Sequence, residues 1–291
     1  MMPYILALSA NLSFALGSMF FTHYARRFSS LWINTVKASV AAVGFFLVIV
    51  LSTGFHDLTI INFSIFFISG FIALGIGDIF LIQAFANLGP ARTLVIFGFH
   101  PVIVGGISFF LFDQDISYGK LVGILFFICC LFTFSYEKFK SSVHWEVAGL
   151  LMALAGMSLD AVGVTITRYA FDMNTNITGF EGNFYRCLGA LFSYFLISFF
   201  KPFHLVAGLK TLNSKSMGFV LLGSILGTFL SLGLYLEAIK VAHLASLSGI
   251  SITAVIFSSL FESIWEKKLP SKYLIISFFF FFGGMYFILS T

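Results

Sequence analysis

Ionisable side chains are rare inside the long apolar segments of this chain, and those found there are best placed to do chemistry. Two cations, Lys37 and Arg186, each lie about two helical turns into such a segment. Two carboxylates, Asp78 and Asp160, lie near the middle of two others. A charge at the centre of a bilayer costs roughly 3 kcal/mol on insertion scales, so each group needs a partner or a cavity. The candidate solute-binding residues are Asn34, Lys37, Asp78, His100, Asp160, Asn183, Arg186 and Glu237.

The two cations have two possible roles. Lys37 and Arg186 could face a cavity and neutralise an anionic or zwitterionic solute, with Asn34 and Asn183 one turn earlier as hydrogen-bond partners. Alternatively, both could extend their long side chains to the lipid headgroups, which a depth of about 10 Å just allows. The sequence favours neither.

The two carboxylates are too short to reach the headgroups. One of them could carry a coupling proton or oppose a cationic solute. The alternative is a fixed internal ion pair, which we favour for Asp78. Its basic partner would be Lys37, Arg168 or Arg186. Asp160 has no acidic counterpart in the first half of the chain, where Ala15 stands, and this asymmetry favours recognition of a solute.

His100 and Glu237 are weaker candidates. His100 precedes Pro101, which we expect to bend a helix, and a histidine there could titrate with a driving proton. A hydrogen-bonded core histidine is the more common case. Glu237 lies near a helix end and could face headgroups. The six histidines are scattered and the three cysteines lack metal-binding or redox spacing, so we expect no enzyme, metal or cofactor, with protons as the possible coupling ion.

The composition places these residues in a membrane. Hydrophobic residues make up 59% and charged residues 10% of the 291, with 41 phenylalanines, against roughly 45–50% apolar and about 25% charged in soluble domains. The basic residues other than Lys37 and Arg186 are spread along helix ends, which indicates lipid headgroups rather than nucleic acid. Apolar segments of about 20 residues predict ten transmembrane helices and no soluble domain. They span 3–23, 31–53, 62–87, 91–112, 117–136, 146–170, 179–200, 216–241, 245–265 and 272–290.

The two halves of the chain, 1–140 and 141–291, repeat one another. Thr22-His23-Tyr24-Ala25 matches Thr167-Arg168-Tyr169-Ala170, and Gln83-Ala84 matches Glu237-Ala238. Asn34 and Lys37 likewise match Asn183 and Arg186. Five spans in each half would make the repeats enter the membrane from opposite sides. Such an inverted repeat is typical of transporters that alternate between inward-open and outward-open states around a midplane site.

Four short motifs resemble the drug/metabolite transporter superfamily, EamA-type. They are Gly77-Asp78, Ala84 six residues later, the turn Leu88-Gly89-Pro90-Ala91-Arg92, and Pro101 midway along the fourth span. The ninth span has Val255 where the fourth has Pro101. The resemblance implies ten helices, of which the first to fourth and sixth to ninth line a central cavity. The fifth and tenth would pack outside, consistent with the lack of charged side chains from Leu121 to Tyr136 and from Tyr273 to Leu289.

The sequence therefore predicts a secondary active transporter, an exporter or exchanger of a small metabolite such as an amino acid. No phosphate-binding glycine-rich loop indicates nucleotide hydrolysis. The alternative is a multidrug or organic-cation exporter, in which Asp78, Asp160 and Glu237 would bind the cation. We expect a monomer or homodimer in a bacterial inner membrane, in contact with lipid and a small solute.

The orientation of the chain in the membrane has two predictions. The loops after odd-numbered spans hold eleven basic residues and those on the other side hold three, which places both termini outside the cytoplasm. The resemblance implies that both termini are inside.

Overall fold

The computed structural model describes residues 2–25, 27–52, 54–112, 117–140, 146–265, 267 and 272–290. The regular elements of these residues are helices, without a strand, as the sequence predicts. Six described helices are long and apolar enough to cross a membrane, and shorter apolar helices accompany them. The six cover Met2–Ala25, Ser30–Leu51, Ile60–Leu88, Val147–Met173, Gly179–Phe200 and Ser214–Val241. The predicted end of the second span, Thr53, and the residues just after the predicted repeat boundary, 141–145, lie outside the described part.

The first half begins with two long helices, and Ser29 caps the second by accepting a hydrogen bond from the N–H of Trp32. A third rod follows in three consecutive parts, and the fourth predicted span is divided in two. In order, the elements are α1 (Met2–Ala25), α2 (Ser30–Leu51), α3 (Ile60–Gly70), η1 (Phe71–Gly77), α4 (Asp78–Leu88), α5 (Pro90–Phe97), α6 (His100–Phe112) and α7 (Tyr118–Lys140).

The second half has the same plan, with one short helix, α10, added in a connection. A capping box of Thr178 and Glu181 starts α9, because each side chain bonds the backbone N–H of the other residue. The elements are α8 (Val147–Met173), α9 (Gly179–Phe200), α10 (Leu205–Lys210), α11 (Ser214–Ser224), η2 (Ile225–Leu230), α12 (Ser231–Val241), α13 (Leu244–Ile250), α14 (Thr253–Trp265) and α15 (Lys272–Ser290).

A π-helical segment interrupts the same rod in each half. Phe71, where η1 begins, precedes Gln83 by as many residues as Ile225, where η2 begins, precedes Glu237. The two π segments therefore occupy equivalent positions of the repeat. Widened turns of this kind occur often at functional sites, and η1 ends directly before Asp78.

The predicted helices over 91–112 and 245–265 are each broken in the middle, which corrects the expectation of one bent helix at Pro101. The first break follows Phe97, and Pro101 falls in the first turn of α6, where its missing N–H loses no helical hydrogen bond. The second break lies between α13 and α14, where no proline stands. Asn11 of α1 supplies hydrogen bonds at this second break. Its Nδ2 donates to the carbonyl of Ile250 at 2.9 Å and to Oγ1 of Thr253 at 3.0 Å.

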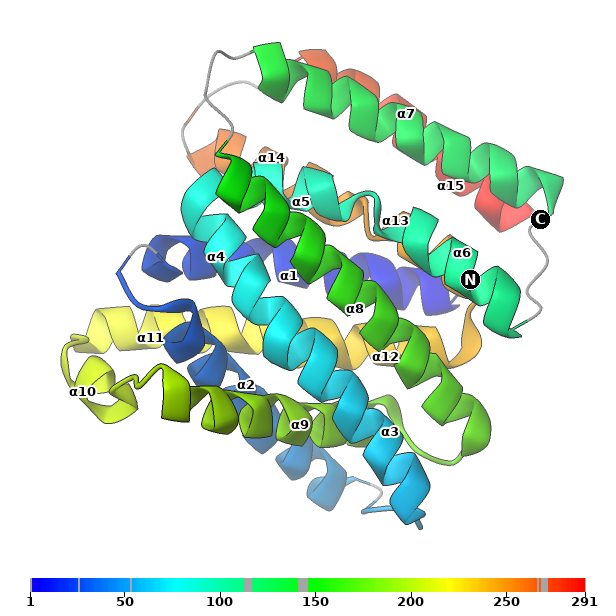
Figure 1. Cartoon of the computed structure of the whole chain (residues 1–291). Coiled ribbons are helices and arrows are strands. Elements are labelled where there is room, and N and C mark those ends of the chain that lie inside the picture. Colours follow the sequence, from blue (N-terminus) through cyan, green and yellow to red (C-terminus); the bar gives the residue numbers. More distant parts are fainter. Residues whose placement is uncertain are drawn as a thin grey trace.

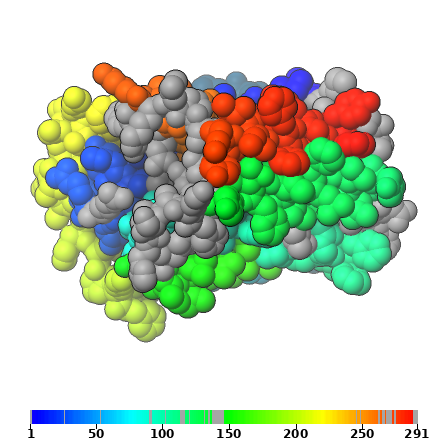
Figure 2. All heavy atoms as spheres, turned by 90° about the horizontal axis from the view of Figure 1, so that it is seen from above, coloured from blue at the N-terminus to red at the C-terminus, as the bar shows by residue number. Residues whose placement is uncertain are grey.

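The helices α7 and α15 pack against each other at one side of the bundle (Figure 1), and their side chains cover much of the face seen in Figure 2. Phe132 of α7 and Phe279, Phe282 and Tyr286 of α15 are exposed. Helices with such apolar side chains can face the lipid of a bilayer, because their backbone polar groups are hydrogen-bonded within the helix.

Both chain termini lie at one end of the bundle, with the α8–α9 and α12–α13 connections (Figure 1). We call this end the terminal face, and the end with the α1–α2 and α4–α5 connections the opposite face. At the middle of the bundle the halves approach closely. A Cβ atom at Gly17 of α1 would collide with the backbone of Gly227 in η2, and one at Gly163 of α8 would collide with Ala73 in η1. Glycine therefore lets α1 and α8 pack against the π segment of the other half.

Candidate functional site

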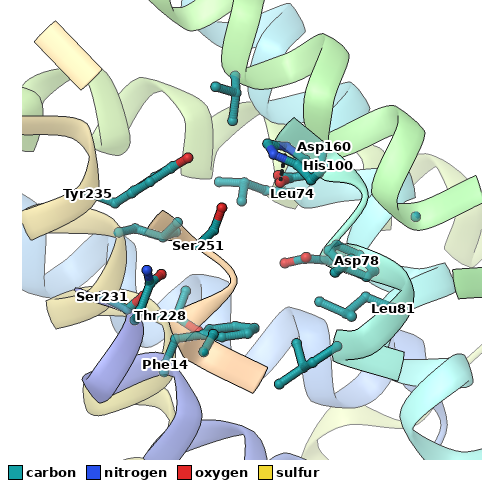
Figure 3. Close-up of a pocket in the computed structure, with 18 of the residues that line it drawn as sticks. Phe14, Leu74, Asp78, Leu81, His100, Asp160, Thr228, Ser231, Tyr235 and Ser251 are labelled. Atoms are coloured by element: carbon teal, nitrogen blue, oxygen red, sulfur yellow. Dashed lines mark ion pairs between the residues drawn. The ribbon is translucent and has the colours of Figure 1, made fainter. Parts of the chain in front are cut away.

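A cavity of about 130 Å³ lies between the two halves. Helices α1, α2, α4 to α6, α8, α9, α12 and α14 and both π segments contribute side chains to it, whereas no described residue of α7 or α15 lines it. This arrangement agrees with the expectation that the fifth and tenth spans pack outside. Figure 3 shows Asp78, Asp160, Tyr235 and Ser251 around it. Its polar side chains are Asn11, Lys37, Asp78, His100, Asp160, Arg186, Thr228, Ser231, Tyr235 and Ser251.

Lys37 and Asp78 form an ion pair in the cavity wall. Lys37 Nζ lies 2.6 Å from Asp78 Oδ2, and their side chains are 4% and 16% exposed. Lys37 also lies over the ring of Phe21, 5.4 Å from its centroid. The internal pair favoured for Asp78 is present, and Lys37 does not extend to the headgroups. Because each charge compensates the other, this pair is stable without a solute.

Arg186 is the repeat equivalent of Lys37 but forms an ion pair with no carboxylate of the described residues. Its side chain is 1% exposed and lines the cavity. Among the described residues it forms no ion pair, its Nε has no hydrogen-bond partner, and its Nη1 makes one long contact of 3.5 Å with Asn183 Oδ1. The difference arises at Leu232, which is the repeat equivalent of Asp78. It precedes Glu237 by as many residues as Asp78 precedes Gln83. The second half therefore has leucine where the first half has the counter-ion of Lys37.

Asp160 of α8 is the most accessible carboxylate of the cavity, with 36% of its side chain exposed. His100 approaches it from the start of α6, with Nε2 3.2 Å from Asp160 Oδ2, as the dashed line in Figure 3 shows. The histidine is 4% exposed, and the contact lies off the axis of a hydrogen bond, so neither ring nitrogen has a hydrogen-bond partner in the described part of the chain. The two groups form an ion pair if the histidine is protonated.

The remaining predicted candidates lie outside the cavity wall. Asn34 Nδ2 donates to the carbonyl of Asp78 at 2.9 Å, and Asn183 Nδ2 donates to that of Leu232 at 2.7 Å. Both amides therefore tie neighbouring helices together just after the π segments. Glu237 Oε1 accepts the N–H of Gly179, at the start of α9, at 2.7 Å. Of the eight predicted residues, the structure brings five together: Lys37, Asp78, His100, Asp160 and Arg186.

Asn11, Thr228, Ser231, Tyr235 and Ser251 also line the cavity and were not among the predicted residues. Hydroxyls in apolar helices commonly bond a carbonyl of their own helix, so their sequence carries little signal of a cavity. A usable signal was the position of Thr228 and Ser231 close to glycines 227 and 233 in the eighth span.

The model of the EamA-like transporter family matches the chain twice, over residues 1–136 and 147–290. No curated protein matches the chain. A solved structure, described as the crystal structure of a protein, superimposes with a TM-score of 0.78 at 15% sequence identity. The match covers 99% of this chain and 98% of that one, and identity this low indicates a shared fold alone.

Proposed function

Since the chain belongs to the EamA-like transporter family of the drug/metabolite transporter superfamily, and is thus a multi-pass membrane protein, we propose that it is a secondary active transporter. It exports or exchanges a small zwitterionic metabolite, such as an amino acid, across a bacterial inner membrane by alternating access. The solute binds in the central cavity, between two inverted repeats of five transmembrane helices each.

The observation that carries this proposal is the unpaired cation at Arg186. An arginine buried within a membrane protein needs a compensating anion, and the described residues offer it no ion pair. A carboxylate of the solute supplies that anion, and the planar guanidinium can bind it through two parallel hydrogen bonds. Lys37 is not free for this role because Asp78 neutralises it.

Asp160 provides the opposite charge. Its exposed carboxylate can accept a hydrogen bond from a solute ammonium, while Thr228 and Ser231 supply neutral polar groups to the same cavity. One available cation and one available carboxylate match a zwitterion, which carries both charges on a small frame. The hydrophobic side chains Phe14, Leu74 and Leu81 leave room for an apolar substituent.

Alternating access is supported by a difference between the two ends of the bundle. At the terminal face, Arg168 Nη1 donates to the carbonyls of Ile239 at 2.8 Å and Ala242 at 2.9 Å, and Glu237 accepts from Gly179. At the opposite face the repeat equivalents, His23 and Gln83, make no side-chain hydrogen bond to described residues. Two other side chains there, Tyr24 and Trp32, donate to the carbonyls of Ser216 and Leu205. We therefore propose that the terminal face is closed in this conformation and that the opposite face closes in the alternate state.

The proposed ten spans follow from counting each interrupted rod once. The parts α3, η1 and α4 make one crossing, as do α11, η2 and α12, and each broken pair, α5–α6 and α13–α14, makes one more. With α1, α2, α7, α8, α9 and α15 the count is ten. Broken helices at a central site are typical of transporters with inverted repeats.

The second candidate is an exporter of organic cations. Asp160 would hold the cation, and the aromatic rings of Phe14, Phe97 and Tyr235 in the cavity wall would surround it. Both candidate functions involve Asp160, but a permanent cation has no carboxylate that Arg186 could bind. The two are therefore distinguished by their response to substitution of this arginine.

The test is counterflow in proteoliposomes loaded with unlabelled solute. The probes are an equimolar mixture of radiolabelled L-amino acids and, separately, radiolabelled tetraphenylphosphonium. We expect saturable amino-acid counterflow that falls at least about tenfold in Arg186→Met, the loss of a charged hydrogen bond. Phosphonium counterflow that survives in Arg186→Met and disappears in Asp160→Asn would establish the cation exporter instead.

A further inference from the structure

Thr228, within η2, has a buried hydroxyl that lacks a hydrogen-bond partner among the described residues. The residue is 4% exposed and lines the cavity. Two other buried threonines are satisfied within their own helices. Thr35 Oγ1 donates to the carbonyl of Leu31 at 2.8 Å, and Thr165 Oγ1 donates to that of Ala161 at 2.9 Å. Buried polar groups are generally hydrogen-bonded, so a molecule in the cavity is needed to supply the partner of Thr228.

The π segment explains why this threonine differs from the others. In an α-helix, a threonine hydroxyl commonly bonds the carbonyl four residues earlier. Backbone hydrogen bonds in η2 span five residues instead, as from the N–H of Ser231 to the carbonyl of Leu226. The widened turn moves the carbonyl of Ser224 away from the side chain of Thr228, and the hydroxyl is left for the cavity.

The backbone just before Thr228 is held in place by α1. Ser13 Oγ donates to the carbonyl of Leu226 at 2.7 Å. The next residue, Gly227, lies against Gly17 so closely that a Cβ atom at Gly17 would collide with it. A hydroxyl on a fixed backbone can select a solute by the position of one polar group, because the supporting residues keep it from moving aside.

The first half of the chain has no counterpart of this hydroxyl. Leu74 is the repeat equivalent of Thr228, since each follows the start of its π segment by the same number of residues, and both line the cavity. Figure 3 shows Thr228 and Ser231 on one side of the cavity, with Asp78 and Asp160 on the other. Ser231 Oγ also makes no hydrogen bond to a described residue. Two neutral hydroxyls therefore line the wall away from the carboxylates.

We propose that Thr228, together with Ser231, determines specificity by binding an uncharged hydrogen-bonding group of the solute, a hydroxyl or a carboxamide. This inference rests on the proposed function and names its solute class, an amino acid with a neutral polar side chain. Arg186 and Asp160 bind the two charges that every amino acid carries, whereas the hydroxyls contact the side chain, whose carbon atoms pack against Leu74. A purely apolar side chain would leave the hydroxyl of Thr228 unpartnered and bind more weakly.

The test compares radiolabelled L-threonine with L-valine, and L-asparagine with L-leucine, in the counterflow assay. The members of each pair have nearly the same shape, and only one of them carries the hydrogen-bonding group. We expect the wild type to have an apparent affinity about tenfold higher for the polar member of at least one pair. Thr228→Val keeps the shape of the residue and removes its hydroxyl, so the ratio should fall to about one while the affinity for the apolar member is retained. Thr228→Ser should keep the preference.

Thr165→Val is the matched control, because Thr165 is buried, bonds its own helix and does not line the cavity. It should keep the wild-type ratio. If Thr228→Val does not fold, Thr228→Ala combined with Ser231→Ala removes both hydroxyls and should lose the preference in the same way. Equal affinities within both pairs in the wild type, or an unchanged ratio in Thr228→Val, would overturn the inference while leaving the transporter intact. Absence of amino-acid counterflow in the wild type would overturn both it and the proposed function.

Discussion

Asn34 and Asn183 make the same hydrogen bond in the two halves of the molecule. Each donates Nδ2 to a backbone carbonyl just after a π segment, that of Asp78 in the first half and that of Leu232 in the second. The two acceptors are equivalent in the repeat, so the backbone keeps its symmetry where the side chains differ. Asp78 in the first half neutralises Lys37, whereas Leu232 at the equivalent position of the second half cannot neutralise Arg186.

We expect Asn34→Ala and Asn183→Ala each to destabilise the protein by about 1 kcal/mol, the usual net contribution of one hydrogen bond. Because these two bonds are equivalent, the two losses should be similar, with Asn183→Ala slightly the larger since Asn183 Oδ1 also makes the long 3.5 Å contact with Arg186 Nη1. The measurement is thermal unfolding in detergent, with Asn176→Ala, an exposed position in the α8–α9 connection, as the control. If only one of the two substitutions lowered the stability, the two equivalent hydrogen bonds would not contribute equally to it.

Leu232→Asp should give Arg186 the counter-ion that Lys37 already has. The carboxylate would stand in the second half where Asp78 stands in the first, and it would compete with the carboxylate of the solute. We expect the affinity measured by amino-acid counterflow to fall at least about tenfold relative to Leu232→Asn, which changes shape without adding charge. Equal affinities in the two variants would show that Arg186 does not bind the solute.

Breaking the pair of Lys37 and Asp78 should cost more than removing it. Lys37→Met leaves a buried carboxylate without its cation, a change that costs about 3–5 kcal/mol in other proteins. The double variant Lys37→Met with Asp78→Asn removes both charges and should recover most of the loss. Thermal unfolding of the single and double variants checks this, and a double variant no more stable than the single would contradict it.

The sequence predicted the charges of the site because isolated charges in apolar spans are costly and therefore informative. Lys37, Asp78, Asp160 and Arg186 all line the cavity. It could not predict which cation is paired. That outcome depends on the contact between α2 and α4 and on the absence of an equivalent carboxylate at Leu232, a leucine among many in an apolar span.

The breaks in the fourth and ninth spans could not be predicted from the sequence either. Pro101 marked the fourth span, but the equivalent break before Thr253 occurs without a proline, since Asn11 on a distant helix supplies the hydrogen bonds that the break requires. Such long-range compensation leaves no local pattern. The π segments likewise have no periodicity distinct from an α-helix in so apolar a sequence. Glu237, which the sequence places near a helix end and opposite Gln83 in the repeat, lies at the terminal face and accepts the N–H of Gly179 there.

Arg168 and Glu237 should control access to the cavity from the terminal face. Arg168→Ala removes two hydrogen bonds to the end of α12, and Glu237→Gln replaces the charged acceptor of the Gly179 N–H. With this closure weakened, the population of the state open at the terminal face should rise. The reporter is Tyr235→Cys in a chain whose three native cysteines are replaced by alanine, labelled with a membrane-impermeant thiol reagent added at the terminal face.

We expect labelling to become several-fold faster in Arg168→Ala combined with Glu237→Gln, because a loss of about 1–2 kcal/mol shifts a two-state equilibrium by roughly five- to thirtyfold. Gln83, the repeat equivalent of Glu237, makes no side-chain hydrogen bond to a described residue in this conformation. Gln83→Ala should therefore leave the labelling rate from the terminal face unchanged or lower it. In the alternate state, the hydrogen bonds that close the cavity should form at the opposite face. If the double variant is labelled no faster than its parent, these hydrogen bonds do not hold the terminal face closed.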